Sequence, residues 1–104
     1  MTQKVVFAPE ALEDLRALYD LIANAAAPDR AFAYVEAIRQ HLLGFAKFPL
    51  RGTRRDHIRP GLRTIGYKRR ITIAFLATET EVIILRILYA GRDVEALLRD
   101  DDDA

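Results

Sequence analysis

Two different spacings of hydrophobic residues run through this chain, and each spacing predicts a different kind of element. A short β-prone run at residues 4–7 is followed by two stretches in which apolar residues recur every three or four positions, which predicts two amphipathic helices. The break between them, at residues 25–28, is so short that it predicts a helical hairpin. The first apolar stripe contains Leu12, Leu15, Tyr19, Ile22 and Ala26, and the second contains Val35, Ile38, Leu42 and Phe45.

Both predicted helices begin at a proline, a residue that is favoured in the first helical turn. Pro9 opens the first helix and Pro28 opens the second. Acidic residues follow Pro9 within two turns, and we expect them to stabilise the positive end of the helix dipole. These residues are Glu10, Glu13 and Asp14.

Three β-rich runs follow, at residues 62–67, 71–77 and 82–89. The connections between them are only three and four residues long, which predicts an antiparallel meander. The last run begins with residues that are apolar on both faces, so we expect it to be the most buried strand. One more helical turn is expected at residues 93–98. The order β-α-α-β-β-β predicts an α+β fold in which the helical hairpin covers one face of the sheet.

Composition restricts the class of protein. The chain has 104 residues, of which 51% are hydrophobic, and this is enough for one small domain, expected over residues 1–99 with an acidic tail at 100–104. No apolar run approaches the ~20 residues that cross a bilayer, and residues 1–10 lack the features of a signal peptide. The absence of cysteine suits a reducing cytoplasm, so we expect a cytoplasmic protein without a membrane partner.

The sequence contains no pattern for a cofactor, a metal or covalent catalysis. Glycine-rich nucleotide motifs are absent, and neither serine nor cysteine is present to act as a nucleophile. The two histidines, His41 and His57, lack the spacing to each other and to carboxylates that a metal site needs. We therefore expect no cofactor and no metal, and we expect both histidines to face solvent.

Charge is distributed unevenly along the chain, although the net charge is only +1. Residues 1–46 carry −2, residues 47–70 carry +8 and residues 71–104 carry −5. Arginine supplies thirteen of the sixteen cations, and its guanidinium group donates two parallel hydrogen bonds to phosphate or carboxylate. We call residues 47–70 the basic segment. It predicts a surface for a polyanion or an acidic protein, and the alternative is a solvated run of charge.

One arginine lies inside the most apolar predicted strand. Arg86 cannot remain unpaired in a hydrophobic core without a large cost in free energy. We therefore expect it either to reach the open face of the sheet, where Arg63 can approach it, or to pair with a nearby acid such as Asp93.

The element order and two short motifs resemble the toxins of the RelE/ParE superfamily of bacterial type II toxin–antitoxin systems. The motifs are IRPGLR at residues 58–63 and ILRILYAGRD at residues 84–93. The chain is most similar to the ParE branch. It departs from that branch at Tyr89, where ParE sequences commonly carry histidine, and in its acidic tail, which lies outside the family pattern.

The resemblance implies two alternative activities. ParE-like toxins inhibit DNA gyrase and need no catalytic residues, and the ParE-type motifs favour this activity. RelE-like toxins are ribosome-dependent mRNA endonucleases, and in that case Arg63, Arg86 and Tyr89 would stabilise the charge on the scissile phosphate and supply a proton. A third interpretation rests on charge alone and is a nucleic-acid-binding module that uses the basic segment.

The resemblance also implies a protein partner. Such toxins are neutralised by an antitoxin encoded beside them, here a ParD-like protein whose C-terminal segment folds onto the toxin, and operator DNA would be bound only through the antitoxin. We expect contacts to the target or the antitoxin at basic residues and at two apolar residues of the first helix, whose alternative role is ordinary core packing. The candidates are Arg55, Arg59, Arg63, Arg86, Arg92, Leu18 and Tyr19.

Overall fold

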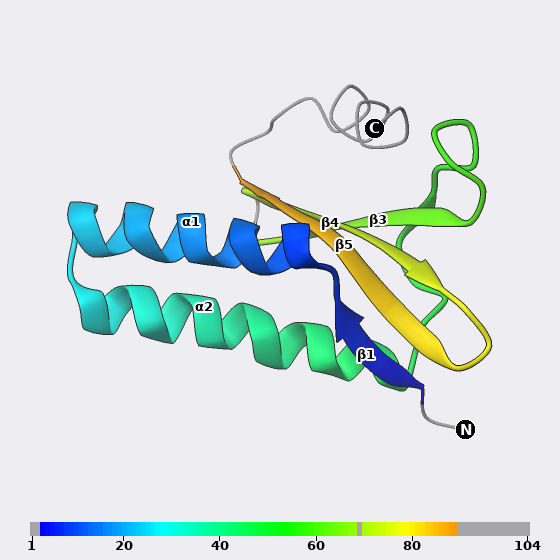
Figure 1. Cartoon of the computed structure of the whole chain (residues 1–104), viewed down its shortest axis with the longest axis horizontal. Coiled ribbons are helices and arrows are strands. Elements are labelled where there is room, and N and C mark those ends of the chain that lie inside the picture. Colours follow the sequence, from blue (N-terminus) through cyan, green and yellow to red (C-terminus); the bar gives the residue numbers. More distant parts are fainter. Residues whose placement is uncertain (1–2, 69, 90–104) are drawn as a thin grey trace.

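Within residues 3–68 and 70–89, which the computed structural model describes, the fold consists of a five-stranded mixed sheet and a helical hairpin (Figure 1). The strands are β1 (Lys4–Phe7), β2 (Thr53–Arg54), β3 (Leu62–Tyr67), β4 (Ile71–Ala77) and β5 (Glu81–Tyr89). Their order in the sheet is β1-β5-β4-β3-β2. β1 runs parallel to β5, and the other neighbouring pairs are antiparallel.

The predicted α+β class and the antiparallel meander are confirmed, since β3, β4 and β5 match the three predicted runs to within one residue. The short strand β2 and the pairing of β1 with β5 were not predicted. Parallel neighbours need a long crossover, and the chain between β1 and β5 supplies it. β5 lies between β1 and β4. Its first half is apolar on both faces because Val82 and Ile84 belong to the main core, whereas Leu85 packs against a smaller cluster on the opposite face.

The two helices are α1 (Pro9–Ala25) and α2 (Pro28–Leu43), followed by the 3-10 turn η1 (Gly44–Ala46). Each helix begins at its proline, as predicted. Figure 1 shows the two helices side by side, forming a layer that packs against the sheet. In the part of the chain that the structure describes, neither helix is long and apolar enough to cross a membrane.

The buried face of α1 is displaced from the predicted stripe. Ala11, Leu15 and Leu18 are buried, whereas Leu12, which the stripe placed inside, is 53% exposed. The predicted stripe that starts at Leu12 and the buried face that starts at Ala11 both have spacings of three and four residues. The small side chain of Ala11 gave no hydrophobic signal that would favour the second choice. Leu18, a predicted contact residue, is only 4% exposed and belongs to the core, which is the alternative role that the sequence left open for it.

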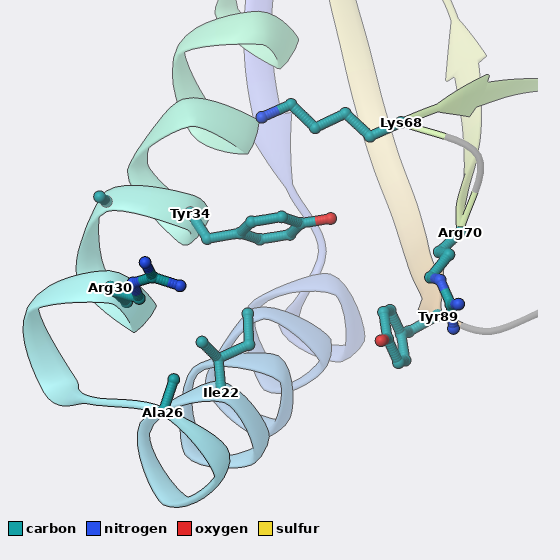
Figure 2. A pocket seen from close by; sticks show the side chains of 8 residues that line it. Ile22, Ala26, Arg30, Tyr34, Lys68, Arg70 and Tyr89 are labelled. Atoms are coloured by element: carbon teal, nitrogen blue, oxygen red, sulfur yellow. The ribbon is translucent and has the colours of Figure 1, made fainter.

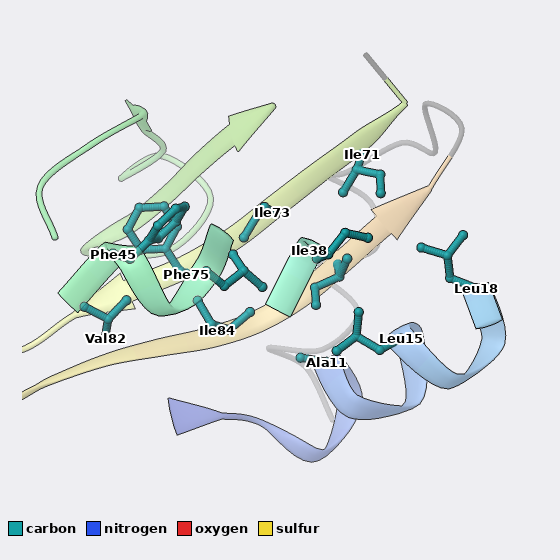
Figure 3. Packing of buried hydrophobic residues seen from close by; sticks show 12 residues of the cluster. Ala11, Leu15, Leu18, Ile38, Phe45, Ile71, Ile73, Phe75, Val82 and Ile84 are labelled. Atoms are coloured by element: carbon teal, nitrogen blue, oxygen red, sulfur yellow. The ribbon is translucent and has the colours of Figure 1, made fainter. Parts of the chain in front are cut away.

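The main core lies between the hairpin and the sheet (Figure 3). Phe45 of η1 packs edge to face against Phe75 of β4, with ring centroids 5.1 Å apart and both side chains fully buried. Such a pair adds to the stabilisation that burial alone provides. The predicted stripe of α2 is confirmed at Ile38, Leu42 and Phe45. This stripe packs the second half of α2 and the turn η1 against the middle of the sheet.

A smaller cluster covers the opposite face of the sheet. It consists of Ile58, Leu62 and Ala74, with Leu76 and Leu85 packed against it. Side chains alternate between the two faces of a strand, so Ala74 points away from the hairpin when its neighbour Phe75 points toward it. Ile58 comes from the loop between β2 and β3, so this loop covers part of the face that the hairpin leaves open.

Gly52 allows β2 to approach β3 closely. Its φ angle is +80°, and an added Cβ atom would overlap the carbonyl oxygen of Thr64. We expect Gly52→Ala to lower the free energy of unfolding by about 1–3 kcal/mol, because it combines backbone strain with a steric clash. Urea denaturation measures the loss.

The matched control for this prediction is Gly44→Ala. Gly44 has helical backbone angles, φ −66° and ψ −17°, and nothing lies within 4 Å of an added Cβ atom. The same substitution there is expected to leave stability unchanged or to raise it by about 0.4–1 kcal/mol. Equal losses at Gly52 and Gly44 would contradict this account of the β2–β3 pairing.

Candidate interaction surface

Hydrogen bonds hold the loop between β2 and β3 in a defined turn. The Asp56 carboxylate accepts a hydrogen bond from the Gly61 backbone N–H at 2.9 Å and forms an ion pair with Arg54 at 2.8 Å. The Gly61 hydrogen bond, with a further contribution from Arg54, lowers the pKa of Asp56, so this carboxylate stays ionised. Gly61 has a φ angle of +81°, which favours glycine. Arg59, a predicted contact residue, is half-buried in the same turn.

Three further arginines of the basic segment are anchored on the protein itself. The Nε atom of Arg55 donates to the Thr64 hydroxyl at 3.0 Å. The guanidinium group of Arg51 lies 4.4 Å from the centre of the Phe45 ring, a cation–π contact. Arg63 Nη1 lies 3.5 Å from the backbone oxygen of Arg51. Part of the positive charge of the basic segment is therefore held in position by contacts within the protein.

Arg63 and Arg86 lie on opposite faces of the sheet. Arg63 is paired across strands with Phe75, which belongs to the main core, whereas Arg86 is paired with Ala74, which belongs to the smaller cluster. Cross-strand partners share a face. The predicted approach of these two arginines across the open face is therefore wrong.

Arg86 pairs with Asp14 of α1. Its Nε and Nη2 atoms donate to the two carboxylate oxygens at 2.8 Å and 3.0 Å, and the two side chains are only 15% and 14% exposed. The backbone N–H of Ile87 donates to the same carboxylate at 2.9 Å. The prediction that Arg86 pairs with an acid is confirmed, with Asp14 as the acid.

Asp14 occupies the edge of β5 where strand pairing stops. β1 pairs with β5 only as far as Ile84, whose backbone oxygen accepts a hydrogen bond from Ala8. The chain then turns into α1, and the Asp14 carboxylate accepts the next edge N–H of β5, that of Ile87. The sequence assigned Asp14 to the helix dipole, but its main interactions lie across the interface between α1 and β5.

A pocket of ≈ 530 Å³ lies between the sheet and the connected end of the hairpin, where α1 ends and α2 begins. Figure 2 shows Tyr34 of α2 projecting into it, with Lys68 and Arg70 of the β3–β4 turn and Tyr89 of β5 on the opposite side. Arg30 of α2 is the third cation of the lining. The remaining described lining is apolar, and it consists of Ile22, Ala26 and Ala33.

Sequence reasoning missed Arg30, Lys68 and Arg70 as members of one site. Residues 68–70 were counted in the basic segment and interpreted as a connection between strands, but their three consecutive basic residues in a tight turn were not recognised as part of a pocket. Arg30 gave no local signal, because only the packing of the hairpin against the sheet brings it to the turn. We call Arg30, Lys68 and Arg70 the pocket cations.

The three residues expected to act together in an endonuclease are not brought together. Arg63 of β3 is paired with Phe75 of β4, and Phe75 is paired with Ile84 of β5, so Arg63 lies at the same level across the sheet as Ile84. Tyr89 is five residues further along β5, a distance of about 17 Å along the strand. Arg86 is engaged by Asp14. Tyr89 instead shares a pocket with the pocket cations.

A smaller groove of ≈ 190 Å³ lies between α1 and the end of β5. Leu18, Leu21 and Ile87 form its apolar part, and Tyr89 borders both this groove and the larger pocket. Leu21 is 50% exposed, and Tyr19, a predicted contact residue, is half-buried on the same helix. At this groove, the exposed apolar side chain of α1 is therefore Leu21 rather than Leu18.

His41 is packed between aromatic rings instead of facing solvent, which corrects the expectation. Its ring lies 4.4 Å from the Tyr67 ring and 5.5 Å from the Phe45 ring, measured between centroids. Burial and, to a smaller extent, the positive charge of Arg51 lower the pKa of His41 below its ordinary value of 6.5. His57 is exposed in the loop, as expected.

The lowered pKa of His41 predicts a loss of stability in mild acid. In the unfolded chain, His41 takes up a proton as the pH falls through its ordinary pKa of 6.5, whereas in the folded protein the lowered pKa delays this uptake to a more acidic pH. The free energy of unfolding therefore falls as the pH drops from neutral toward the pKa of His41 in the folded protein. Urea denaturation at about pH 7.5 and about pH 5.5 measures this loss. We expect His41→Phe to reduce it and His57→Asn to preserve it. An unchanged loss in His41→Phe would contradict the assignment.

Some predicted features cannot be placed. Arg92, the helical turn expected at residues 93–98 and the acidic tail at 100–104 lie outside the described residues. Within residues 3–68 and 70–89, no group of three or more histidine, cysteine or acidic side chains is arranged to hold a metal ion.

The family model described as the ParE toxin of type II toxin-antitoxin system, parDE, matches residues 5–94. The chain belongs to the ParE toxin family. The match includes both helices and the four longer strands apart from the first residue of β1, and the ParE branch suggested by the two motifs is confirmed. The acidic run at residues 100–103 lies beyond the matched region of this ParE-family chain.

Solved structures agree with the ParE assignment. The chromosomal ParDE toxin–antitoxin system from P. aeruginosa aligns with a TM-score of 0.75 and 25% identity over 86% of this chain and 98% of that chain. The toxin–antitoxin complex RelBE2 from Mycobacterium tuberculosis aligns with a TM-score of 0.61 and 20% identity over 86% and 99% of the two chains, which shows the shared fold alone. A search of curated proteins finds no significant match. This protein is a type II toxin of the ParE family.

Proposed function

We propose that this ParE-family toxin acts in the cytoplasm by inhibiting DNA gyrase and that a ParD-like antitoxin neutralises it. The observation that carries the proposal is the ParE family match over residues 5–94. A toxin that traps gyrase on cleaved DNA needs a binding surface and no catalytic residues. The separation of Arg63 from Tyr89 and the engagement of Arg86 by Asp14 are compatible with this requirement.

The anchored arginines of the basic segment supply a surface suited to a nucleoprotein target. Arg51, Arg55 and Arg63 are each held by a contact within the protein. Side chains that are already positioned lose less conformational freedom when they bind phosphate or carboxylate groups. We assign contact with the gyrase–DNA complex to this surface, together with Arg59 in the adjoining turn.

We assign antitoxin binding to the connected end of the hairpin and the end of β5 beside it. Tyr89 links the larger pocket and the smaller groove, and exposed Leu21 lies beside it. An acidic, partly apolar peptide segment that folds on binding can place apolar side chains against Tyr89 and Leu21 and its carboxylates against the pocket cations. Operator DNA is bound by the other half of the antitoxin, so the toxin reaches it only through the complex.

Pulse labelling after induced expression tests the proposal in cells. Inhibition of gyrase stops replication first, so incorporation of labelled thymidine is expected to fall before incorporation of labelled amino acids. Coexpression of the antitoxin is the control and restores both. A fall in amino-acid incorporation that precedes the fall in thymidine incorporation would count against gyrase as the target.

One observation favours an mRNA endonuclease as the alternative. Tyr89 lies in one pocket with Lys68, Arg70 and Arg30, and a tyrosine with several cations can bind a phosphate and donate a proton to a leaving oxygen. The residues of this alternative are therefore Tyr89 and the pocket cations, in place of the predicted set with Arg63 and Arg86. Primer extension on ribosome-bound message would show new cuts, and Tyr89→Phe would remove them.

A further inference from the structure

The pocket cations are available to bind an anion. Among residues 3–68 and 70–89, no carboxylate forms an ion pair with Arg30, Lys68 or Arg70, and no acidic residue of this part of the chain lines the pocket. The Lys68 ammonium instead lies 5.2 Å from the Tyr34 ring and 5.4 Å from the Tyr67 ring. The pocket therefore combines an apolar floor with three cations that no carboxylate of the described residues engages in an ion pair.

The chain carries an acidic counterpart that begins at the edge of this pocket. Tyr89 lines the pocket and is the last described residue. Residues 90–104 continue from it and carry two arginines and six carboxylates, a net charge of −4, with four consecutive aspartates at residues 100–103. The aspartates lie beyond the region that the ParE family model matches.

The connection is long enough for the aspartates to return to the pocket. Asp100 follows Tyr89 by eleven residues, and an extended chain of this length spans about 36 Å. Single exposed ion pairs are weak, but several carboxylates facing several cations form a network that acts together. Tethering also gives the aspartates an effective concentration near the pocket on the order of millimolar.

From this charge complementarity and the point of attachment, we propose that the acidic run Asp100–Asp103 of this chain binds the pocket cations of the same molecule. Bound there, the run competes with any other anionic segment or nucleic acid for Arg30, Lys68 and Arg70. The contact is an intramolecular regulatory device, and it does not depend on whether gyrase is the target.

Zero-length carbodiimide cross-linking of the full chain tests the contact directly, because it joins a lysine only to a carboxylate in contact with it. The chain has three lysines, Lys4, Lys47 and Lys68. Lys4 is paired with Glu81 at the opposite end of β5 from Tyr89, and Lys47 follows η1 near that same end. Both therefore serve as internal controls. We expect Lys68 to be linked to residues 100–103 within one chain, at several-fold higher yield than Lys4 or Lys47, and we expect added salt to reduce the link.

Peptide binding measures the competition. A labelled oligo-aspartate peptide is expected to bind the variant with Asp100–Asp103 changed to asparagine about tenfold more tightly than the wild type, if the run fills the pocket about nine-tenths of the time. The same four changes in an Arg30→Ala, Arg70→Ala background are expected to give no gain. Arg39→Ala, which removes a cation outside the pocket on the same helix, is the control and preserves the gain.

Three results would overturn the proposal. Equal linking of the tail to Lys4, Lys47 and Lys68 would mean that the acidic run has no preference for the pocket. Links found only in dimers would mean that a second copy supplies the aspartates. Equal peptide affinity for the wild type and the asparagine variant would mean that the pocket is free for a partner protein or nucleic acid. None of these results bears on inhibition of gyrase, so the proposed function fails or stands separately.

Discussion

Phe45→Ala is expected to lower the free energy of unfolding by about 3–5 kcal/mol, the range for removing a large buried aromatic side chain. Phe45 is fully buried and packs against Phe75 at 5.1 Å and against His41 at 5.5 Å between ring centroids. Its removal leaves a cavity at the point where η1 joins the sheet, and it also removes the ring under the Arg51 guanidinium. Urea denaturation followed by circular dichroism measures the loss.

Phe32→Ala is the matched control for this prediction. Phe32 lies on α2 but is 64% exposed, and the same substitution there is expected to change stability by less than about 0.5 kcal/mol. A loss below about 1 kcal/mol for Phe45→Ala would mean that the hairpin is not attached to the sheet through this aromatic pair.

Asp14→Ala is expected to lower the free energy of unfolding by about 3 kcal/mol, because breaking a largely buried ion pair leaves a charge without its main partner. The substitution removes both hydrogen bonds from Arg86 and the acceptor of the Ile87 backbone N–H. For a domain of this size the melting temperature is expected to fall by on the order of 15 °C. Differential scanning calorimetry measures the shift.

Two variants distinguish this interaction from a general effect of charge on α1. Asp14→Asn retains an acceptor of similar shape without the negative charge, and its loss is expected to be intermediate. Asp20→Ala removes an exposed carboxylate from the same helix, and its effect is expected to stay within about 0.5 kcal/mol. If Asp20→Ala were as damaging as Asp14→Ala, the pairing with Arg86 would not explain the loss.

Most of the fold was predictable because strong local signals agree with tertiary packing. Pro9 and Pro28 mark the starts of both helices, and the alternation of Ile71, Ile73 and Phe75 marks the buried face of β4. The rotation of α1 was not predictable in the same way. Leu12 and Ala11 compete for one position in the stripe, and the choice depends on which of the two fits against β5.

The candidate site was predictable only in outline, because charge is visible in a sequence and side-chain direction is not. The basic segment was recognised, but the faces of Arg63 and Arg86 depend on strand register and on the irregularity between Ala74 and Phe75. The partner of Arg86 is 72 residues away in the sequence. Such a contact follows from packing and has no local signature.

The pocket, too, could be predicted only in part from the sequence. Tyr89 was a candidate from the family resemblance, yet the residues that share its pocket come from α2 and from the β3–β4 turn. Lys68 has a φ angle of +50°, a strained conformation for a residue other than glycine, and no sequence pattern indicated it. The position of the pocket cations depends on how the hairpin meets that turn.

The central claim, inhibition of DNA gyrase, is tested most directly by a supercoiling reaction with purified gyrase, ATP, relaxed plasmid and increasing amounts of the toxin. The account predicts loss of supercoiling and accumulation of linear DNA once gyrase is denatured, with both effects abolished when the antitoxin is added first. Normal supercoiling at saturating toxin, with no linear DNA, would contradict it.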